Sequence, residues 1–195
     1  MRVSLSVDSL SPRLTGIGRY CWELVRGLNT RADITATRYF IENNWFPDPT
    51  CLLEPSNEGA KSPRWQDKIE LWWNHRRHSD HIVHAPNYFL PSWAEQGVVT
   101  IHDLSVLKYP ETHPAERIKA FEAGFAATIE RAGLILTDCE WVRREVMDFT
   151  GLGSGRVMAV PLGIAGDFRP RGADELQDFC ARHQLVPGFY GLCVS

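Results

Sequence analysis

The sequence lacks any hydrophobic run long enough to cross a membrane. No window approaches the roughly 18 apolar residues that a membrane-spanning helix needs. The first ten residues, MRVSLSVDSL, hold one arginine and only short apolar stretches before Asp8, so they also lack the apolar core of a signal peptide. These two absences predict a cytoplasmic protein that does not span a membrane.

Cysteine is scarce, and basic residues are not in surplus. The five cysteines lie at positions 21, 51, 139, 180 and 193 without close pairs, which favours neither a zinc knuckle nor a disulfide framework and fits a reducing compartment. The formal net charge of -3 argues against a nucleic-acid-binding protein, which normally carries a basic surplus. Small anionic ligands remain open, because a helix N-terminus supplies a local positive field.

Strand-like and helix-like segments alternate along the chain, which has neither repeats nor low-complexity tracts. Strand patterns cover residues 2–8, 33–40, 81–85, 98–102, 134–137 and 157–160. Helical patterns cover residues 18–28, 65–78, 114–132 and 140–149. This alternation predicts an α/β fold with a Rossmann-like, doubly wound, mostly parallel sheet. The stretch from residue 41 to about residue 64 has no periodic pattern and is expected to be a loop.

The tail of the chain has a different character. The stretch PLGIAGDFRPRG has the composition of a linker, and a helical pattern over 174–184 and the strand-like FYGLCVS follow it. We therefore predict one domain over residues 1–166. Residues 167–195 are expected to be a linker with the first helix and strand of a second domain whose remainder is absent.

Glycines and polar residues follow the ends of five predicted strands. These residues are Gly16, Gly18, Asn87, Tyr88, His102, Asp103, Cys139, Glu140 and Gly163. Because ligands of open parallel sheets bind beyond the carboxyl ends of the strands, we expect a binding site at this edge.

The loop Gly16-Ile17-Gly18 has two interpretations. Glycines let the backbone approach a phosphate, and free N–H groups at the start of the helix would hold it. The same glycines would also make a tight strand-to-helix turn. The spacing lacks the third glycine of the dinucleotide fingerprint, and the chain has no P-loop Gly-Lys-Ser/Thr. From this stretch alone the turn is slightly favoured.

His102 is the strongest single candidate for chemistry. A histidine at the carboxyl end of a strand exchanges protons near neutral pH, and Asp103 would orient its loop. The alternative is that Asp103 caps a turn and that His102 is a buried, hydrogen-bonded side chain.

Two clusters suggest other functions. His75, His78, His81 and His84 recur at every third position, but the first two lie on a predicted helix and the others in or beside a strand, so no metal site is predicted. The segment Trp72-Trp73 with Arg76 and Arg77 suits a lipid surface, although a buried Trp72 with solvated arginines is the simpler interpretation.

Four segments in order carry a resemblance to a known enzyme family. They are TGIGRYCWELVRGL, VVTIHDLSVLKYPETHPAERIKAF, ERAGLILTDCEWVRREV and GRVMAVPLGIAGDFRP. In these segments the chain resembles the N-terminal half of retaining family-4 glycosyltransferases, which have the GT-B fold. The resemblance extends from residue 2 to about residue 195 and is weak over 41–80.

The resemblance implies a hexosyltransferase-like enzyme of polysaccharide biosynthesis. Such enzymes have two Rossmann-like domains: the C-terminal domain grips a nucleotide-sugar donor, and the N-terminal domain shapes the site of a glycan or lipid-linked acceptor. The family retains anomeric configuration and needs no metal or other cofactor, because protein hydrogen-bond donors offset the charge on the leaving diphosphate. A peripheral position at the inner face of the membrane is also expected.

The resemblance also assigns roles to residues. The implied catalytic residues, beside the transferred sugar, are His102 and Asp103. The implied diphosphate contacts are Gly16, Ile17 and Gly18. The implied acceptor-site residues are Asn87, Tyr88 and Arg19. The implied interdomain or donor-side residues are Cys139, Glu140 and Gly163.

The chain departs from the family in two respects. Where the family often has Thr-Val-Ser-Glu-Phe-Ser, residues 137–142 read TDCEWV, so a serine contact is lost or replaced. The C-terminal domain is absent, so we expect the isolated chain to be inactive and its tail to self-associate. Two alternatives stay open: a non-catalytic glycan- or nucleotide-binding module, and another GT-B enzyme such as a nucleotide-sugar epimerase.

Overall fold

A computed structural model describes residues 1–55, 80–164, 166 and 168–191. The chain forms two compact units, Met1–Pro161 and Leu162–Ser195. The first unit contains the whole sheet, and the described part of the second unit contains one helix, α6 (Ala173–Arg182). The prediction that residues 167–195 begin a further domain stays a prediction.

The first unit is built on a seven-stranded sheet with the order β3-β2-β1-β4-β5-β6-β7. The strands are β1 (Arg2–Ser6), β2 (Ala36–Ile41), β3 (Asn44–Phe46), β4 (Ile82–Ala85), β5 (Gly97–Ile101), β6 (Ala132–Thr137) and β7 (Val157–Ala159). Neighbouring strands pair in parallel, except β2 and β3, which pair antiparallel. The predicted α/β fold with a mostly parallel sheet is confirmed.

Three long helices of the first unit form where the patterns over 18–28, 114–132 and 140–149 predict them, whereas three short helices were not predicted, one of them in the stretch expected to be a loop. The described helices of this unit are α1 (Gly16–Thr30), η1 (Pro49–Leu53), α3 (Ser105–Lys108), η2 (Pro110–Thr112), α4 (Ala115–Arg131) and α5 (Glu140–Thr150). The predicted helix over 65–78 lies outside the described residues. Among the helices that are described, none is long and apolar enough to cross a membrane.

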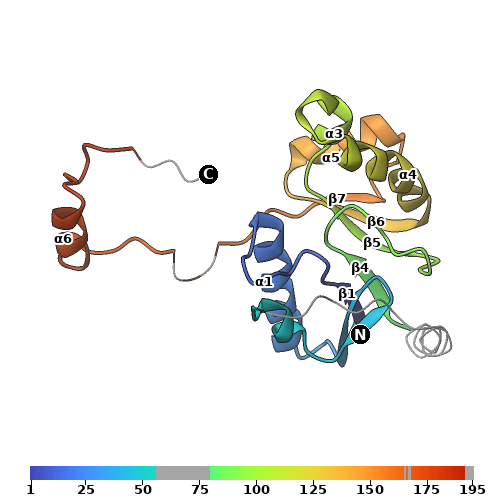
Figure 1. The fold of residues 1–195 in the computed structure, drawn as a ribbon, viewed down its shortest axis with the longest axis horizontal. Coiled ribbons are helices and arrows are strands. Elements are labelled where there is room, and N and C mark those ends of the chain that lie inside the picture. Colours follow the sequence, from blue (N-terminus) through green and yellow to red (C-terminus); the bar gives the residue numbers. More distant parts are fainter. Residues whose placement is uncertain (56–79, 165, 167, 192–195) are drawn as a thin grey trace. The chain divides into compact units, whose positions relative to one another are not determined.

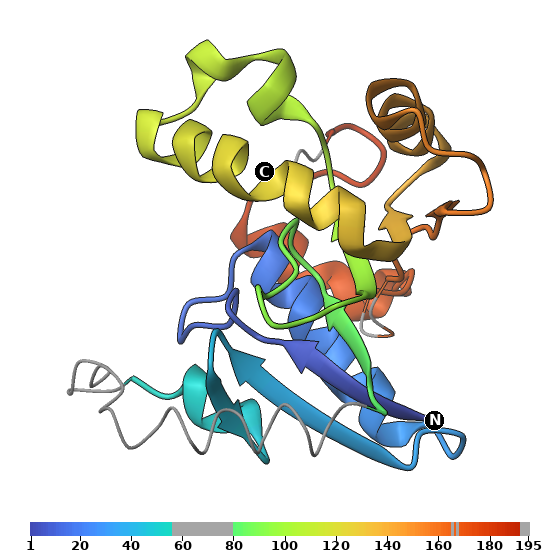
Figure 2. The same cartoon turned by 90° about the vertical axis from the view of Figure 1, so that its right-hand side faces the viewer.

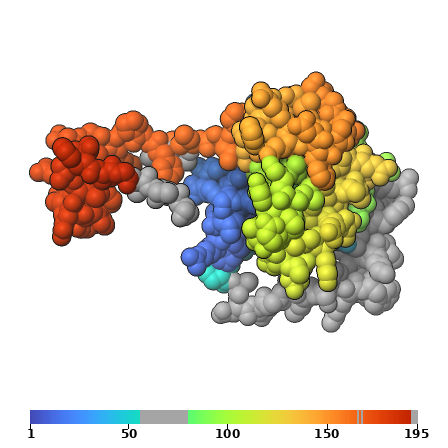
Figure 3. Space-filling view, turned by 90° about the horizontal axis from the view of Figure 1, so that it is seen from above, coloured from blue at the N-terminus to red at the C-terminus, as the bar shows by residue number. Residues whose placement is uncertain are grey.

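Helices cover both faces of the sheet. One core cluster joins α1 to the first strands through Leu5, Val7, Cys21, Val25 and Tyr39. A second cluster packs α4 and α5 on the other strands through residues that include Val99, Ile101, Phe121, Phe125 and Val146. α1 and α4 thus lie on opposite sides of the sheet (Figures 1 and 2). Figure 3 shows α3 and α4 (green to yellow) beside α5 (orange) on the surface of this unit.

Two local predictions were wrong. The stretch after residue 41 begins with a hairpin, not with a loop: β2 turns at Glu42, which has a φ of 51°, and β3 returns antiparallel. Its Trp45 ring packs 5.3 Å from Phe40 and 5.5 Å from Trp93, a contact that a three-residue strand does not reveal in its sequence pattern. The predicted strand in the tail is not formed over 189–191, its described part, because strands need a paired neighbour.

Candidate functional site

The strand order brings four loops to one edge of the sheet. β1 has β2 on one side and β4 on the other. From β1 the chain first adds β2 and β3 on one side and then adds β4 to β7 on the other side, so the strand order reverses between β1 and β4. In doubly wound folds, ligands bind beyond the carboxyl ends of the strands at this reversal. The loops that follow β1, β4, β5 and β6 carry most of the predicted site residues.

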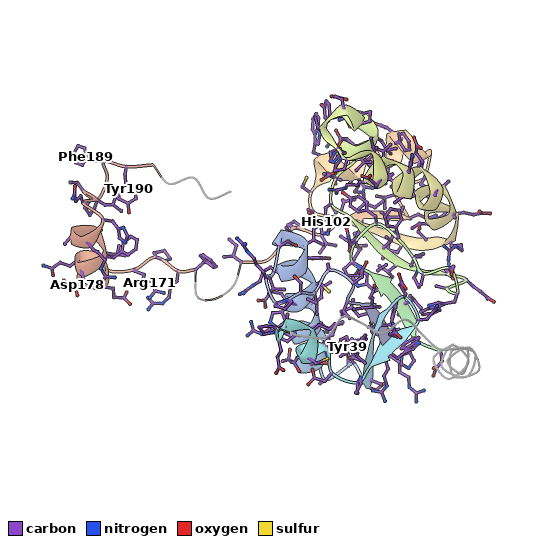
Figure 4. All side chains as sticks on the ribbon, in the orientation of Figure 1. Tyr39, His102, Arg171, Asp178, Phe189 and Tyr190 are labelled. Carbon is purple, nitrogen blue, oxygen red and sulfur yellow. The ribbon has the colours of Figure 1, made fainter. Side chains whose placement is uncertain are left out.

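His102 connects the ends of three adjacent strands. It follows β5 directly, and its Nδ1 lies 2.9 Å from Oδ2 of Asp138, after β6. Its Nε2 lies 3.0 Å from the carbonyl oxygen of Pro86, after β4. The His102 side chain is only 12% exposed, so the imidazole is held in place at the edge of the sheet (Figure 4).

Tyr20 brings the beginning of α1 to the same place. Its ring meets the His102 ring edge-on, with centroids 5.0 Å apart. Its hydroxyl lies 3.2 Å from Oγ1 of Thr100, which in turn lies 3.0 Å from Nε2 of His84. Burial raises the pKa of Tyr20, so its hydroxyl stays protonated near neutral pH. The glycine loop and the imidazole therefore share one edge of the sheet.

The two glycines of the loop serve different purposes. A Cβ on Gly18 would lie 2.7 Å from the carbonyl oxygen of Ser9, so this position needs glycine for packing. A Cβ on Gly16 would meet nothing within 4 Å. Thr15 caps α1 by accepting a hydrogen bond from the Gly18 N–H, and the N–H groups of Gly16 and Ile17 have no acceptor among the described residues.

Asp103 is hydrogen-bonded to α3. Its Oδ1 accepts hydrogen bonds from the backbone N–H of Ser105 at 2.8 Å and from the Ser105 hydroxyl at 2.6 Å. Partial burial raises the pKa of Asp103, but its hydrogen bonds with Ser105 and Tyr88, together with the nearby charge of Arg117, outweigh this effect and lower the pKa overall. Asp103 therefore closes the turn that leads into α3, which is the structural alternative for this residue, and its catalytic role stays a prediction.

The Asn87–Tyr88 loop is strained. Tyr88 is buried with a φ of 56°, a left-handed backbone conformation that is unfavourable for a side chain of this size. Its ring lies 6.4 Å from that of His102, and burial raises the pKa of its hydroxyl. Oδ1 of Asn87 is buried and has no hydrogen-bond partner within residues 1–55, 80–164, 166 and 168–191. Strain and an unsatisfied polar atom beside His102 are features that cluster at ligand sites.

The roles of the other predicted residues stay predictions, and the structure shows the local surroundings of each. Arg19, on α1, pairs with Glu23 at 3.1 Å instead of with Asn87 or Tyr88. Cys139 is the exposed N-cap of α5 and gives it no side-chain hydrogen bond. Glu140 pairs at 2.8 Å with Arg143 of the same helix. Gly163 belongs to the second unit and has open space around its Cα.

The four histidines that recur at every third position, from His75 to His84, form no metal site in the described part of the chain. No group of three or more potential ligands comes together among the described residues. Nδ1 of His81 lies 3.0 Å from the Ser4 hydroxyl, and His84 bonds to Thr100. His75 and His78 lie outside the described residues, as does the Trp72–Arg77 segment.

Sequence reasoning missed Asp138 and Tyr20 as parts of the site. Asp138 was noted only as a departure from a family motif. Ile101 pairs with Thr137 in the sheet, so the residues that follow them, His102 and Asp138, emerge side by side. The order and register of β5 and β6 would have identified Asp138, but neither is readable from one sequence.

Comparison with known proteins points to one class of enzyme. No family model matches the chain. The chain is 28% identical over 213 aligned residues to O-antigen chain mannosyltransferase B of Escherichia coli, a match that includes the whole of this chain. The chain spans 56% of the length of that relative. The class named for the relative agrees with the resemblance drawn from the four sequence segments.

Proposed function

We propose that this chain is the acceptor-side half of a glycosyltransferase that moves a sugar from a nucleotide sugar to a glycan or lipid-linked acceptor. The observation that carries this proposal is the similarity of the whole chain to a mannosyltransferase. Mannose is therefore the first sugar to test, and a growing polysaccharide is the first acceptor. The edge of the sheet around His102 supports the proposal, because it lies at the position where doubly wound folds bind ligands.

In this proposal the start of α1 faces the donor diphosphate. The N–H groups of Gly16 and Ile17 are unused within the described residues, and the first turn of α1 holds no acidic side chain. The open space at Gly16 would admit a phosphate to these groups. Such donors would stabilise the leaving diphosphate without a metal ion, in a reaction that retains anomeric configuration.

His102 would lie beside the transferred sugar, with the Asn87–Tyr88 loop as part of the acceptor wall. Oδ1 of Asn87, which is unsatisfied in the described part of the chain, would accept a hydrogen bond from a hydroxyl group of the acceptor. Cys139 and Glu140 would lie at the edge of the donor site, and a second domain would complete the rest of that site. We therefore expect no transfer by the 195-residue chain alone.

Ligand titration of the chain tests this proposal. Nucleoside diphosphate sugars, GDP-mannose among them, are titrated against the labelled protein while its NMR spectrum is recorded. We expect weak, millimolar binding that perturbs Gly16, Ile17 and His102 and is unchanged by a metal chelator. Gly16→Ala should weaken binding at least several-fold, because its methyl group would occupy the space left for the phosphate.

The matched control is Gly27→Ala, which adds the same methyl group to an open position of α1 far along the helix. It should bind like the wild type. Absence of binding by every nucleotide sugar, or equal binding by Gly16→Ala and the wild type, would contradict the proposal. Micromolar binding without any partner domain would favour a non-catalytic binding module instead.

A further inference from the structure

The two strands at the reversal of the sheet end level with each other. Leu5 of β1 lies opposite His84 of β4, so the same register brings Asp8 level with Asn87, each two residues beyond the end of its strand. Paired positions of neighbouring strands point to the same face of a sheet. The hydroxyl of Ser6 donates a hydrogen bond to Oδ1 of Asp8 at 3.0 Å, which keeps the Asp8 side chain on the face of Ser6. Asp8 and Asn87 therefore lie within reach of one ligand, at the position where doubly wound folds bind ligands.

The side chains of Asp8 and Asn87 offer hydrogen-bond acceptors that lack donors. Oδ1 of Asn87 is buried and unsatisfied among the described residues. Asp8 is exposed, and the only hydrogen bonds that its carboxyl receives in the described part of the chain come from residues 6–9. Amide oxygens and ionised carboxylates accept hydrogen bonds and donate none. The pair therefore suits a ligand that brings hydrogen-bond donors.

The charge at this position decides which donors fit. Partial burial raises the pKa of Asp8, hydrogen bonds from Ser6 and the backbone act against this, and no basic side chain of the described residues contributes. No cation therefore offsets the charge of Asp8 in the part of the chain that is described. A carboxylate or phosphate on the ligand would bring further acceptors and a like charge, and both weaken binding. The hydroxyl groups of a sugar are uncharged donors and suit both oxygens.

We propose that Asp8 and Asn87 are a specificity-determining pair that binds two hydroxyl groups of an uncharged sugar and rejects a sugar that carries a carboxylate or phosphate. The inference rests on the proposed function, in which the Asn87–Tyr88 loop is part of the acceptor wall. Oδ1 of Asn87 accepts a hydrogen bond from one hydroxyl, and the Asp8 carboxylate accepts one from a neighbouring hydroxyl of the same ring. The acceptor is thereby narrowed from any glycan to one that presents a neutral sugar.

Pairs of methyl glycosides test the proposal on the 195-residue chain. Methyl glycosides of mannose, glucose and galactose are each compared with the uronate in which a carboxylate replaces the CH₂OH group. Titrations are followed by ¹⁵N NMR of the backbone and of the Asn87 side-chain amide, which is assigned by its loss in Asn87→Ala. We expect at least one neutral glycoside to shift the signals of Asp8 and Asn87, and its uronate to bind at least about three-fold more weakly, because Asp8 repels it. Equal binding of that glycoside and its uronate, or no shift at Asp8 and Asn87 with any neutral glycoside, would overturn the proposal.

Two variants test whether the Asp8 charge causes this discrimination. Asp8→Asn keeps the shape of the side chain and should bring the binding of the uronate to within about two-fold of the neutral glycoside. Asp148→Asn removes the same charge from an exposed position of α5 and should discriminate like the wild type. Unchanged discrimination in Asp8→Asn would overturn the proposal. Failure of nucleotide sugars to bind would count against the proposed function, whereas this test contains no nucleotide and its failure would leave donor binding intact.

Discussion

At the residue scale, His102 is the residue whose importance both sequence and structure support, but they support it for different reasons. The sequence offered a histidine at a strand end, with Asp103 as its orienting neighbour. In the structure the orienting carboxylate belongs to Asp138, 36 residues away along the chain, and Asp103 bonds to Ser105. Adjacent residues of a strand end point in different directions, so the nearest acidic residue in sequence was the wrong partner.

The two loop glycines make a residue-scale prediction about stability. Gly18→Ala should destabilise the protein by about 1–3 kcal/mol, because its methyl group would press on the Ser9 carbonyl oxygen and force the backbone to move. Gly16→Ala meets no atom within 4 Å and should unfold at the wild-type urea concentration or above it. Urea unfolding followed by circular dichroism measures both variants. Equal unfolding midpoints for the two would show that the close approach at Gly18 is not a constraint.

At the scale of elements, the connections between helices and strands depend on a few long side chains. Arg131, in the last turn of α4, is the main example, because it binds the loop that joins β4 to β5. Its Nη1 donates to the carbonyl oxygens of Pro91 at 2.7 Å and Ala94 at 2.6 Å, and its Nε donates to that of Ala127 at 3.0 Å. This loop begins with Asn87 and Tyr88, so Arg131 also holds the far end of the candidate acceptor loop.

Arg131→Met keeps most of the aliphatic side chain and removes the guanidinium. We expect it to lower the free energy of unfolding by about 1–3 kcal/mol, since several partly buried carbonyl groups lose a charged donor. Chemical denaturation gives the value. Lys119→Met, at an exposed position of the same helix, is the control and should change stability by much less. A loss no larger than that of the control would mean that the loop does not depend on Arg131.

The hairpin of β2 and β3 shows where element-scale prediction from sequence failed. Strand prediction depends on alternation over several residues, and β3 has only three. Its position is decided by the aromatic group of Phe40, Trp45 and Trp93, and Trp93 comes from a distant part of the chain. The same limit applies to the predicted strand in the tail, whose apolar pattern has no strand to pair with in the described part of its unit.

At the scale of the whole molecule, stability should depend on pH through His84. Burial lowers the pKa of His84 to about 4, below its usual value of 6.5. The unfolded chain therefore binds a proton between these two pH values that the folded protein does not bind. The stabilising contribution is complete above pH 6.5 and is lost as the pH falls towards 4, by up to about 3 kcal/mol.

His84→Gln should flatten this part of the stability curve. Free energies of unfolding are measured in urea from pH 4 to pH 7 for the wild type and the variant, and their difference isolates His84 from other groups. One such group is Asp8, whose carboxyl pKa is raised by burial. His183→Gln replaces an exposed histidine and serves as the control. Parallel curves for the wild type and His84→Gln would contradict the prediction.

Local sequence patterns were sufficient for the fold class and for bringing most of the candidate site residues to one edge of the sheet. Alternating strand and helix signals depend on side-chain spacing within ten to twenty residues, and parallel strands necessarily end at a common edge. The partners within the site were decided only by the tertiary structure. Strand order and register place Pro86, His102 and Asp138 together and bring Tyr20 of α1 onto the ring, and both depend on contacts between segments that are far apart in the chain.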